Sequence, residues 1–201
     1  MVLVVAAGLL LTGLVAWQRS VRTHQATQVT ASVNNVLKNL GDSFFGSATL
    51  AGVNTQALIQ LGVWPQTRIQ NTNGVRQVRH ELGGAEWVEV VPINYQRSLG
   101  AQVGTSLPAN TAYRHIVTHV PTESCAILVN ELSTISRYVV VLPYSPAHDS
   151  AGMSQGYALN TALGVTAKVD GFRISPASLD AACHSNNSTG GLHTLEFVVT
   201  L

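Results

Sequence analysis

The chain opens with a long apolar run, Met1–Trp17, that contains no charged residue, and the first charge is Arg19. Behind this run, apolar residues recur at spacings typical of one helical stripe: Val29, Val33, Val36, Leu37, Leu40 and Phe44. Neither Pro nor Gly interrupts residues 14–40, and Gly41 is a typical C-cap. The pattern predicts one helix from residue 1 to about 41, roughly 60 Å long, apolar all round in its first half and amphipathic in its second.

An apolar start of this kind has several interpretations. A cleaved secretory signal fits poorly, because no basic residue precedes the run and residues 18–22 do not resemble a small-residue cleavage site. A membrane helix needs about 20 apolar residues, so this run is slightly short for one. Gly8, Thr12 and Gly13 are small residues that let other helices approach closely. Because the helix continues into an amphipathic half, we interpret the run as the front of one rod.

The remaining pattern alternates between short helices and strands. Helices are predicted from the cap Asn54 to Leu61, over residues 123–134 behind the cap Thr122, and after Ser175-Pro176. Strands are predicted over residues 86–93, 112–120, 137–142, 165–174 and 193–201, and residues 66–84 read as a loop. A long helix followed by a sheet with small helices indicates an α+β fold.

Composition narrows the function. The chain has 201 residues, only 10% of them charged, and a net charge of +1, which leaves no basic surface for nucleic acid. Its two cysteines, Cys125 and Cys183, permit one disulfide, and two buried free thiols are the alternative.

Candidate chemistry is weak throughout. Residues 152–156 fit G-x-S-x-G around Ser154, but the predicted strand before them ends near Leu142, whereas the hydrolase motif needs a strand directly before the turn. His115 and His119 would lie on one face of a strand about 13 Å apart, too far to share a metal. Asn186 and Asn187 begin N-x-S/T sequences that also read as a polar turn. No cofactor site, metal site or enzyme activity is expected.

In their order along the chain, four features resemble the type IVb group of type IV pilins. They are the apolar start leading into the amphipathic helix, the short helix Thr55–Leu61 with Gly83-Gly84 before a strand, the helix "ESCAILVNEL", and the ending "ASLDAACHSNNSTGGLHTLEFVVTL". The group includes the toxin-coregulated, bundle-forming and conjugative thin pili. Each motif alone is unspecific, and their common order carries the resemblance.

The resemblance implies a pilin fold, with a long helix on an antiparallel sheet and a disulfide between Cys125 and Cys183. Residues 1–24 would form a protruding half-helix, and residues 25–201 a globular domain with an amphipathic half-helix 25–41, a connecting loop 42–84 and a sheet and disulfide region 85–201. The half-helix would serve as membrane anchor and filament core through Val2, Leu3, Val4, Val5, Leu9, Leu10, Leu11, Leu14, Val15 and Trp17. Gly8 and Gly13 would soften it on assembly, and the stripe from Val29 to Phe44 would pack on the sheet.

The implied role is a structural subunit of a filament used in adhesion, aggregation or conjugative mating. The implied partners are identical subunits, the inner-membrane assembly machinery, a prepilin peptidase and a host or recipient cell surface. The subunit would reside in the inner membrane and then in an extracellular pilus. Two alternatives are a minor pilin or type II secretion pseudopilin at a filament tip, and an anchored periplasmic hydrolase using Ser154.

The start of the sequence departs from the family pattern. Neither a leader peptide nor the glutamate common near the mature N-terminus is present. We expect the mature protein to begin about seven residues before Met1, with that glutamate about three residues before it; the alternative is a pilin with Val5 in the glutamate's place.

Overall fold

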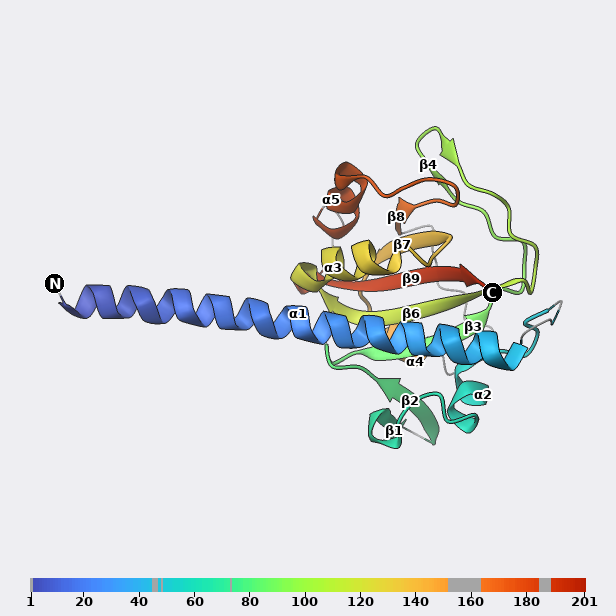
Figure 1. Cartoon of the computed structure of the whole chain (residues 1–201), viewed down its shortest axis with the longest axis horizontal. Coiled ribbons are helices and arrows are strands. Elements are labelled where there is room, and N and C mark those ends of the chain that lie inside the picture. The colour runs from blue at the N-terminus through green and yellow to red at the C-terminus, as the bar shows by residue number, and fades with distance from the viewer. Residues whose placement is uncertain (1, 45–46, 48, 73, 152–163, 185–188) are drawn as a thin grey trace.

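The computed structural model of the chain describes residues 2–44, 47, 49–72, 74–151, 164–184 and 189–201, and only the backbone of residues 2–12, 150–151 and 189. A long helix lies across one face of an antiparallel sheet and projects far beyond it (Figure 1). This confirms the α+β prediction.

The long helix α1 spans Val2–Phe44. It continues through Gly41, where the sequence predicted its end, because the C-terminal turn packs: Leu40 is fully buried and Phe44 contacts the same apolar cluster. Burying an aliphatic side chain contributes about 1.5–3 kcal/mol. The four fully buried residues Val29, Val33, Val36 and Leu40 therefore hold this half of α1 with roughly 10 kcal/mol.

The main sheet of the described residues has seven strands in the spatial order β1-β2-β3-β6-β9-β7-β8, and every neighbouring pair is antiparallel. Its strands are β1 Ile69–Thr72, β2 Val75–Arg79, β3 Ala85–Val90, β6 Ala112–Pro121, β7 Tyr138–Pro143, β8 Val165–Lys168 and β9 Leu192–Thr200. A small hairpin is formed by β4 Ser98–Leu99 and β5 Gln102–Val103. The shorter helices are α2 Thr55–Gln60, α3 Thr122–Leu132, α4 Pro146–Ala151 and α5 Pro176–His184, with single 3₁₀ turns at η1 Gln66–Arg68 and η3 Thr189–Gly191.

Several local predictions were wrong. Residues 66–84 are not a loop, because they hold η1 and the hairpin of β1 and β2. Strand β8 ends at Lys168 rather than at residue 174. The N-cap of α3 is Pro121, because the Thr122 hydroxyl instead donates to the Gly191 carbonyl at 3.0 Å. The predicted cap of α2 is confirmed, since the Asn54 side chain accepts from the Ala57 N–H at 3.0 Å.

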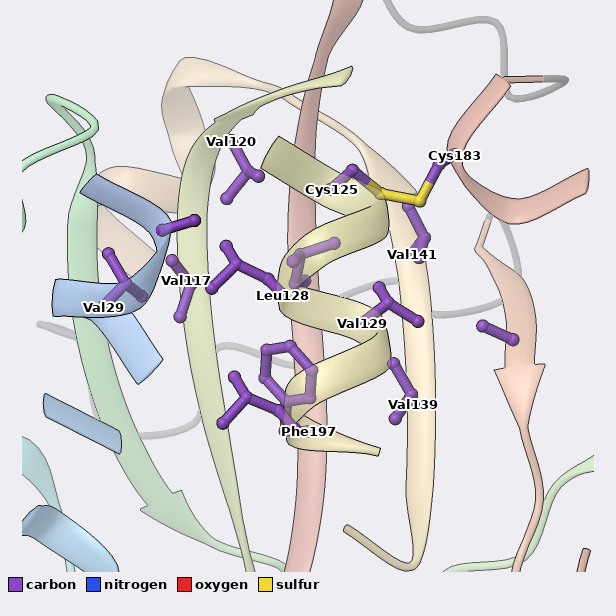
Figure 2. Packing of buried hydrophobic residues seen from close by; sticks show 14 of the residues in the cluster. Val29, Val117, Val120, Cys125, Leu128, Val129, Val139, Val141, Cys183 and Phe197 are labelled. Carbon is purple, nitrogen blue, oxygen red and sulfur yellow. A yellow bond between two sulfur atoms is a disulfide. The ribbon is translucent and has the colours of Figure 1, made fainter. Parts of the chain in front are cut away.

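Two apolar clusters hold the docked half of α1, one at each end. Toward the N-terminus, Ala26, Val29 and Val33 pack in the cluster that contains α3, β7, β9 and α5 (Figure 2). We call residues 122–201 the disulfide region. Toward the C-terminus, Val36 and Leu40 pack in a cluster with residues of α2, the segment after it, β2 and β3. We call residues 50–90 the connecting region.

A bulge in β6 brings the turn before β3 close to the sheet. The pairing of β6 with β9 shifts between Val117 and Val120, and His119 there has a φ of 55°. A Cβ on Gly84 would lie 2.2 Å from the Thr118 carbonyl oxygen. Only glycine therefore fits at this position, which explains the Gly-Gly pair that precedes β3.

Candidate functional site

The docked half of α1 presents a continuous stripe to the domain. Ala26, Val29, Val33, Val36 and Leu40 are each 0% exposed. These positions repeat at three and four residues, so they lie on one face of the helix. Leu37 and Phe44 lie beside the stripe and are partly buried against the cluster of the connecting region. The sequence stripe is therefore the docking face of α1.

The projecting half of α1 exposes large apolar side chains. Leu14 is 50% exposed, and Val15 and Trp17 are each 63% exposed. The backbone is helical from Val2 and through Gly8 and Gly13, and the side chains over residues 2–11 that were predicted to form the filament core lie outside the described ones. A search of the described residues finds no helix with the combined length and apolar character that a bilayer crossing requires.

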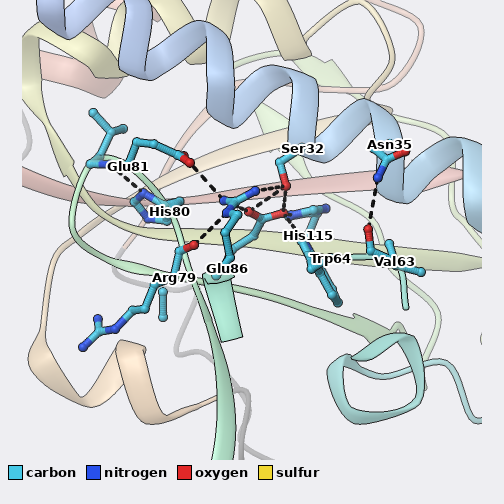
Figure 3. A network of polar contacts seen from close by, with 12 residues as sticks. Ser32, Asn35, Val63, Trp64, Arg79, His80, Glu81, Glu86 and His115 are labelled. Carbon is cyan, nitrogen blue, oxygen red and sulfur yellow. Dashed lines mark hydrogen bonds and ion pairs between the residues drawn. The ribbon is translucent and has the colours of Figure 1, made fainter. Parts of the chain in front are cut away.

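Between the two apolar clusters, the buried carboxylate of Glu86 joins α1 to the sheet. Its side chain is 0% exposed and accepts hydrogen bonds from four others (Figure 3). The Ser32 hydroxyl of α1 donates to Oε1 at 2.8 Å, and the Trp64 indole does so at 3.0 Å. Nε2 of His115 also donates to Oε1, at 2.9 Å, and Nη2 of Arg68 donates to Oε2 at 2.8 Å.

We call Glu86 with Ser32, Trp64, Arg68 and His115 the Glu86 hub. Burial disfavours the charged carboxylate, but the hydrogen bond and charge of His115, with the Arg68 guanidinium and the Ser32 hydroxyl, outweigh it and lower the pKa of Glu86 to about 2. Arg68 also donates through Nη1 to the Ser32 oxygen at 2.7 Å. A buried carboxylate on β3 that keeps its charge therefore links the connecting region to α1 and to β6.

The connecting region makes further contacts beside the Glu86 hub. The Asn35 amide of α1 donates to the Val63 carbonyl at 3.0 Å (Figure 3). His80 is buried, its Nε2 donates to the Thr118 carbonyl at 2.9 Å, and its Nδ1 accepts from the Leu82 N–H at 3.2 Å. These bonds fit a neutral imidazole, and burial lowers the pKa of His80 to about 4.

In the disulfide region, a covalent bond joins α3 to α5. Cys125 and Cys183 form a disulfide with a Cα–Cα distance of 5.9 Å, which rules out the free-thiol alternative (Figure 2). Cys125, Leu128, Val129 and Leu132 are all buried, as their spacing on one helix face predicts. At the C-terminal end of α3, Nζ of Lys168 donates to the carbonyl oxygens of Ser133 and Ser136. Helix α3 is thus fixed at both ends.

The opposite face of the sheet holds a second buried carboxylate. Neighbouring side chains of a strand point to opposite faces, so Trp87 points away from α1, and its indole donates to the His148 carbonyl of α4 at 3.1 Å. On β9, Glu196 is 0% exposed and lies 3.9 Å from Nη1 of Arg114. Burial raises its pKa despite the nearby arginine charges. A hydrogen bond from Tyr95 also favours the charged form of Glu196, but burial outweighs it, in contrast to Glu86.

The weak catalytic and metal candidates do not combine into a site. His115 binds Glu86, whereas His119 stacks edge-on against Tyr144 with ring centroids 4.9 Å apart. The expectation that both histidines share a face was wrong, because the bulge interrupts the alternation of β6. Among the described residues, no cluster of His, Cys, Asp and Glu suits a metal ion. Ser154, Asn186 and Asn187 lie outside the described residues.

The sequence missed the Glu86 hub, although one signal points to it. Glu86 stands in the strand sequence Ala-Glu-Trp-Val-Glu-Val, where its charge alone suggests an exposed position. The apolar residue Val88 lies two positions further on, and therefore on the same face, and is fully buried. A charged residue in register with a buried valine is the signal that could have identified it.

A long helix docked by one stripe on an antiparallel sheet, with a disulfide that closes the C-terminal part, is the fold of the type IV pilins. The solved structures similar to this chain include the crystal structure of TcpA, a type IV pilin from Vibrio cholerae El Tor biotype. The TM-score is 0.53 at 14% identity, over 88% of this chain and 99% of TcpA.

Two structures of type IVb pilins from Salmonella typhi are also similar. The crystal structure has a TM-score of 0.45 at 15% identity over 87% of this chain and 96% of that one. The NMR structure of PilS has a TM-score of 0.44 at 13% identity, over 88% of this chain and 97% of PilS. No family model and no curated protein sequence matches the chain.

Proposed function

We propose that this chain is the structural subunit of a type IVb pilus filament, polymerised through the projecting half of α1. The observation that carries the proposal is the exposure of Leu14, Val15 and Trp17 on a helix that extends beyond the domain (Figure 1). The likeness to TcpA supports the fold on which the proposal rests.

The physical argument concerns the environment of the projecting half. Each large apolar side chain left in water forgoes about 1.5–3 kcal/mol. The domain leaves these residues largely exposed, because they lie two to three helical turns before Gln25, which donates to the Glu81 carbonyl, and Ala26, which is fully buried. Two environments remain, a bilayer and the same helix of other copies. The first would hold the subunit in the inner membrane before assembly, and the second would form the filament core.

This proposal assigns roles to the two parts of the chain. Residues 1–24 are the anchor and core helix, including the residues Val2–Leu11, and residues 25–201 are the globular domain on the filament surface. Gly8 and Gly13 are the sites where α1 softens on assembly, since each glycine lowers helix stability by about 1 kcal/mol. The filament is extracellular, serves adhesion, aggregation or conjugation, and has no catalytic role.

The test is assembly in cells. The full chain is expressed with a type IVb assembly system and its prepilin peptidase, and sheared surface fractions are examined by electron microscopy. We expect homopolymeric filaments of this chain, and we expect Val15→Lys to abolish them while the thermal unfolding of its domain stays unchanged. Lys38→Gln, on an exposed position of the docked half, is the matched control.

Two results would contradict the proposal. One is a full-length protein that stays monomeric in fractions without pili. The other is a chain that occurs only in rare copies on filaments of another pilin, which would indicate a minor pilin or a pseudopilin instead.

A further inference from the structure

The docking stripe of α1 continues past the domain, but with different chemistry. Stepping back from Ala26 by the same spacing of three and four residues gives Arg22, Arg19 and Val15. Two guanidinium groups therefore occupy stripe positions that hold apolar side chains in the docked half. The stripe faces the side on which the domain lies, so both arginines point toward the space beside α3.

That space is a groove of about 910 Å³ between α1 and α3. Val15, Trp17 and Val21 form its apolar wall on α1, and Ala126 and Ile127 form the apolar wall on α3. The remaining lining is polar or charged: Gln18, Arg19, Arg22, Thr23, Gln25 and Glu123. The groove thus combines apolar walls with two cations.

The charges of the groove favour an anion. In the part of the chain that the structure describes, no carboxylate lies within ion-pair distance of Arg19 or Arg22. Glu123 is the single carboxylate that lines the groove, so the two arginines leave it net positive. Arginine pairs of this kind bind phosphate through charge-assisted hydrogen bonds. A ligand with a phosphate and a hydrocarbon chain matches both features.

The position of the groove along α1 indicates where that ligand comes from. The helical part of the uncharged run, Val2–Trp17, is about 24 Å long, close to the hydrocarbon thickness of a bilayer of about 30 Å. If that run is embedded, as the proposed function requires, then Trp17, Arg19 and Arg22 lie at the headgroup level. Tryptophan and arginine are the residues that prefer this level.

We propose that the groove between α1 and α3 binds an anionic phospholipid before assembly, with the phosphate between Arg19 and Arg22. The acyl chain lies along Val15, Val21 and Ile127. The inference rests on the membrane stage of the proposed function. A bound lipid fixes how far α1 is inserted and how the domain sits on the bilayer. The competing occupant is an acidic segment of a second copy.

Trp17 reports on the groove directly. Trp64 and Trp87 are each 2% exposed, whereas Trp17 is 63% exposed, so a quencher carried by the lipid acts on Trp17 alone. The full chain is reconstituted in phosphatidylcholine vesicles that contain phosphatidylglycerol, with bromine on the acyl chains of one lipid or the other. We expect brominated phosphatidylglycerol to quench Trp17 several-fold more than an equal fraction of brominated phosphatidylcholine does.

Charge variants assign the preference to the groove. A basic residue near an anionic surface is worth about 1 kcal/mol, or about fivefold in binding. Arg19→Gln and Arg22→Gln should each lower the preference for phosphatidylglycerol about fivefold, and Glu123→Gln should raise it. Arg173→Gln, an exposed cation far along the chain, should leave it unchanged.

The outcomes are distinguishable. Equal quenching by both lipids overturns the inference and leaves the membrane stage intact. Quenching by neither lipid overturns the membrane stage and the inference together. Self-association in lipid-free detergent that Arg19→Gln and Arg22→Gln abolish, with no lipid preference, assigns the groove to a second copy instead.

Discussion

The disulfide region and the connecting region dock the same helix by different means. In the disulfide region, Ala26, Val29 and Val33 meet a helix that is tied to α5 by the Cys125–Cys183 bond. In the connecting region, Val36 and Leu40 pack against a segment that has no disulfide crosslink. The adjacent Glu86 hub holds this segment to α1 and to β6. Both regions bury apolar side chains of α1, so the difference lies in what keeps each docking surface together.

The difference has a physical consequence. A disulfide stabilises mainly by restricting the unfolded chain, and it does so at any pH. A buried ion cluster stabilises only while each charge has its partner, because an unpaired buried charge is costly. The disulfide region should therefore respond to reduction, and the connecting region to charge substitution and to acid.

The largest effect is expected from removing the disulfide. Cys125→Ser opens a crosslink between positions 58 residues apart, which on the chain-entropy estimate costs about 4 kcal/mol. The midpoint of urea unfolding should fall accordingly, and wild-type protein with dithiothreitol should match the variant. Reducing agent should leave the variant itself unchanged. An unaltered midpoint would show that apolar packing alone holds α3 and α5 together.

The next effect tests the Glu86 hub. Glu86→Gln keeps the shape of the side chain but leaves the Arg68 charge without its buried partner, so we expect a loss of about 3 kcal/mol. Equilibrium unfolding measures the loss. Glu131→Gln is the matched control, because Glu131 also accepts from a hydroxyl of α1, that of Thr30, but is only partly buried. A difference of less than about 1 kcal/mol between the two variants would contradict the hub's role.

A smaller effect is expected from acid. The pKa of His80 is about 4 in the folded protein and ordinarily 6.5, so the unfolded chain binds the proton first as the pH falls. The contribution of His80 to stability is full above pH 6.5 and decreases as the pH falls toward 4, with a loss of roughly 2 to 3 kcal/mol at pH 4.5. Below pH 4.5 the unfolded form of Glu86 is protonated first as well, so the loss continues toward pH 2.

The acid effect is measured as the urea midpoint at pH 7, 5.5 and 4.5. Burial also lowers the pKa values of His148 and His193, so these residues contribute to the same decrease. His80→Asn isolates the share of His80: the variant should be less stable at pH 7 and should lose less on acidification. An identical pH slope in the variant and the wild type would refute this assignment.

The sequence predicted those parts of the fold whose signal is local. The stripe from Val29 to Leu40 identified the docking face, and Asn54 identified the start of α2, because both patterns depend on neighbours within a few turns. The sequence did not predict the hairpin of β1 and β2. Its outer strand is largely exposed and polar, so residues 69–72 show no alternation of apolar and polar positions. Its pairing with β2 is visible only in three dimensions.

The candidate site was predictable in part for the same reason. The apolar character of the projecting half is evident from composition alone. The Glu86 hub is not, because its other members come from three separate segments, up to 54 residues from Glu86 in sequence: Ser32 in α1, Trp64 and Arg68 after α2, and His115 in β6. Polar contacts between residues far apart in sequence produce no periodic pattern in the sequence, so only the three-dimensional structure reveals them.

The Glu86 hub also determines the position of α1 along its own axis relative to the sheet. The apolar stripe is nearly self-similar toward its C-terminal end, so a slip of one turn, about 5.4 Å, that puts Leu37 in the place of Val33 and Leu40 in the place of Val36 would keep these positions apolar. The same slip brings Val36 to the place of Ser32, and a valine has no hydroxyl to donate to Glu86. Ser32 therefore selects one register of α1 on the sheet among several that the apolar stripe alone would allow. This register also determines how much of α1 extends beyond the domain.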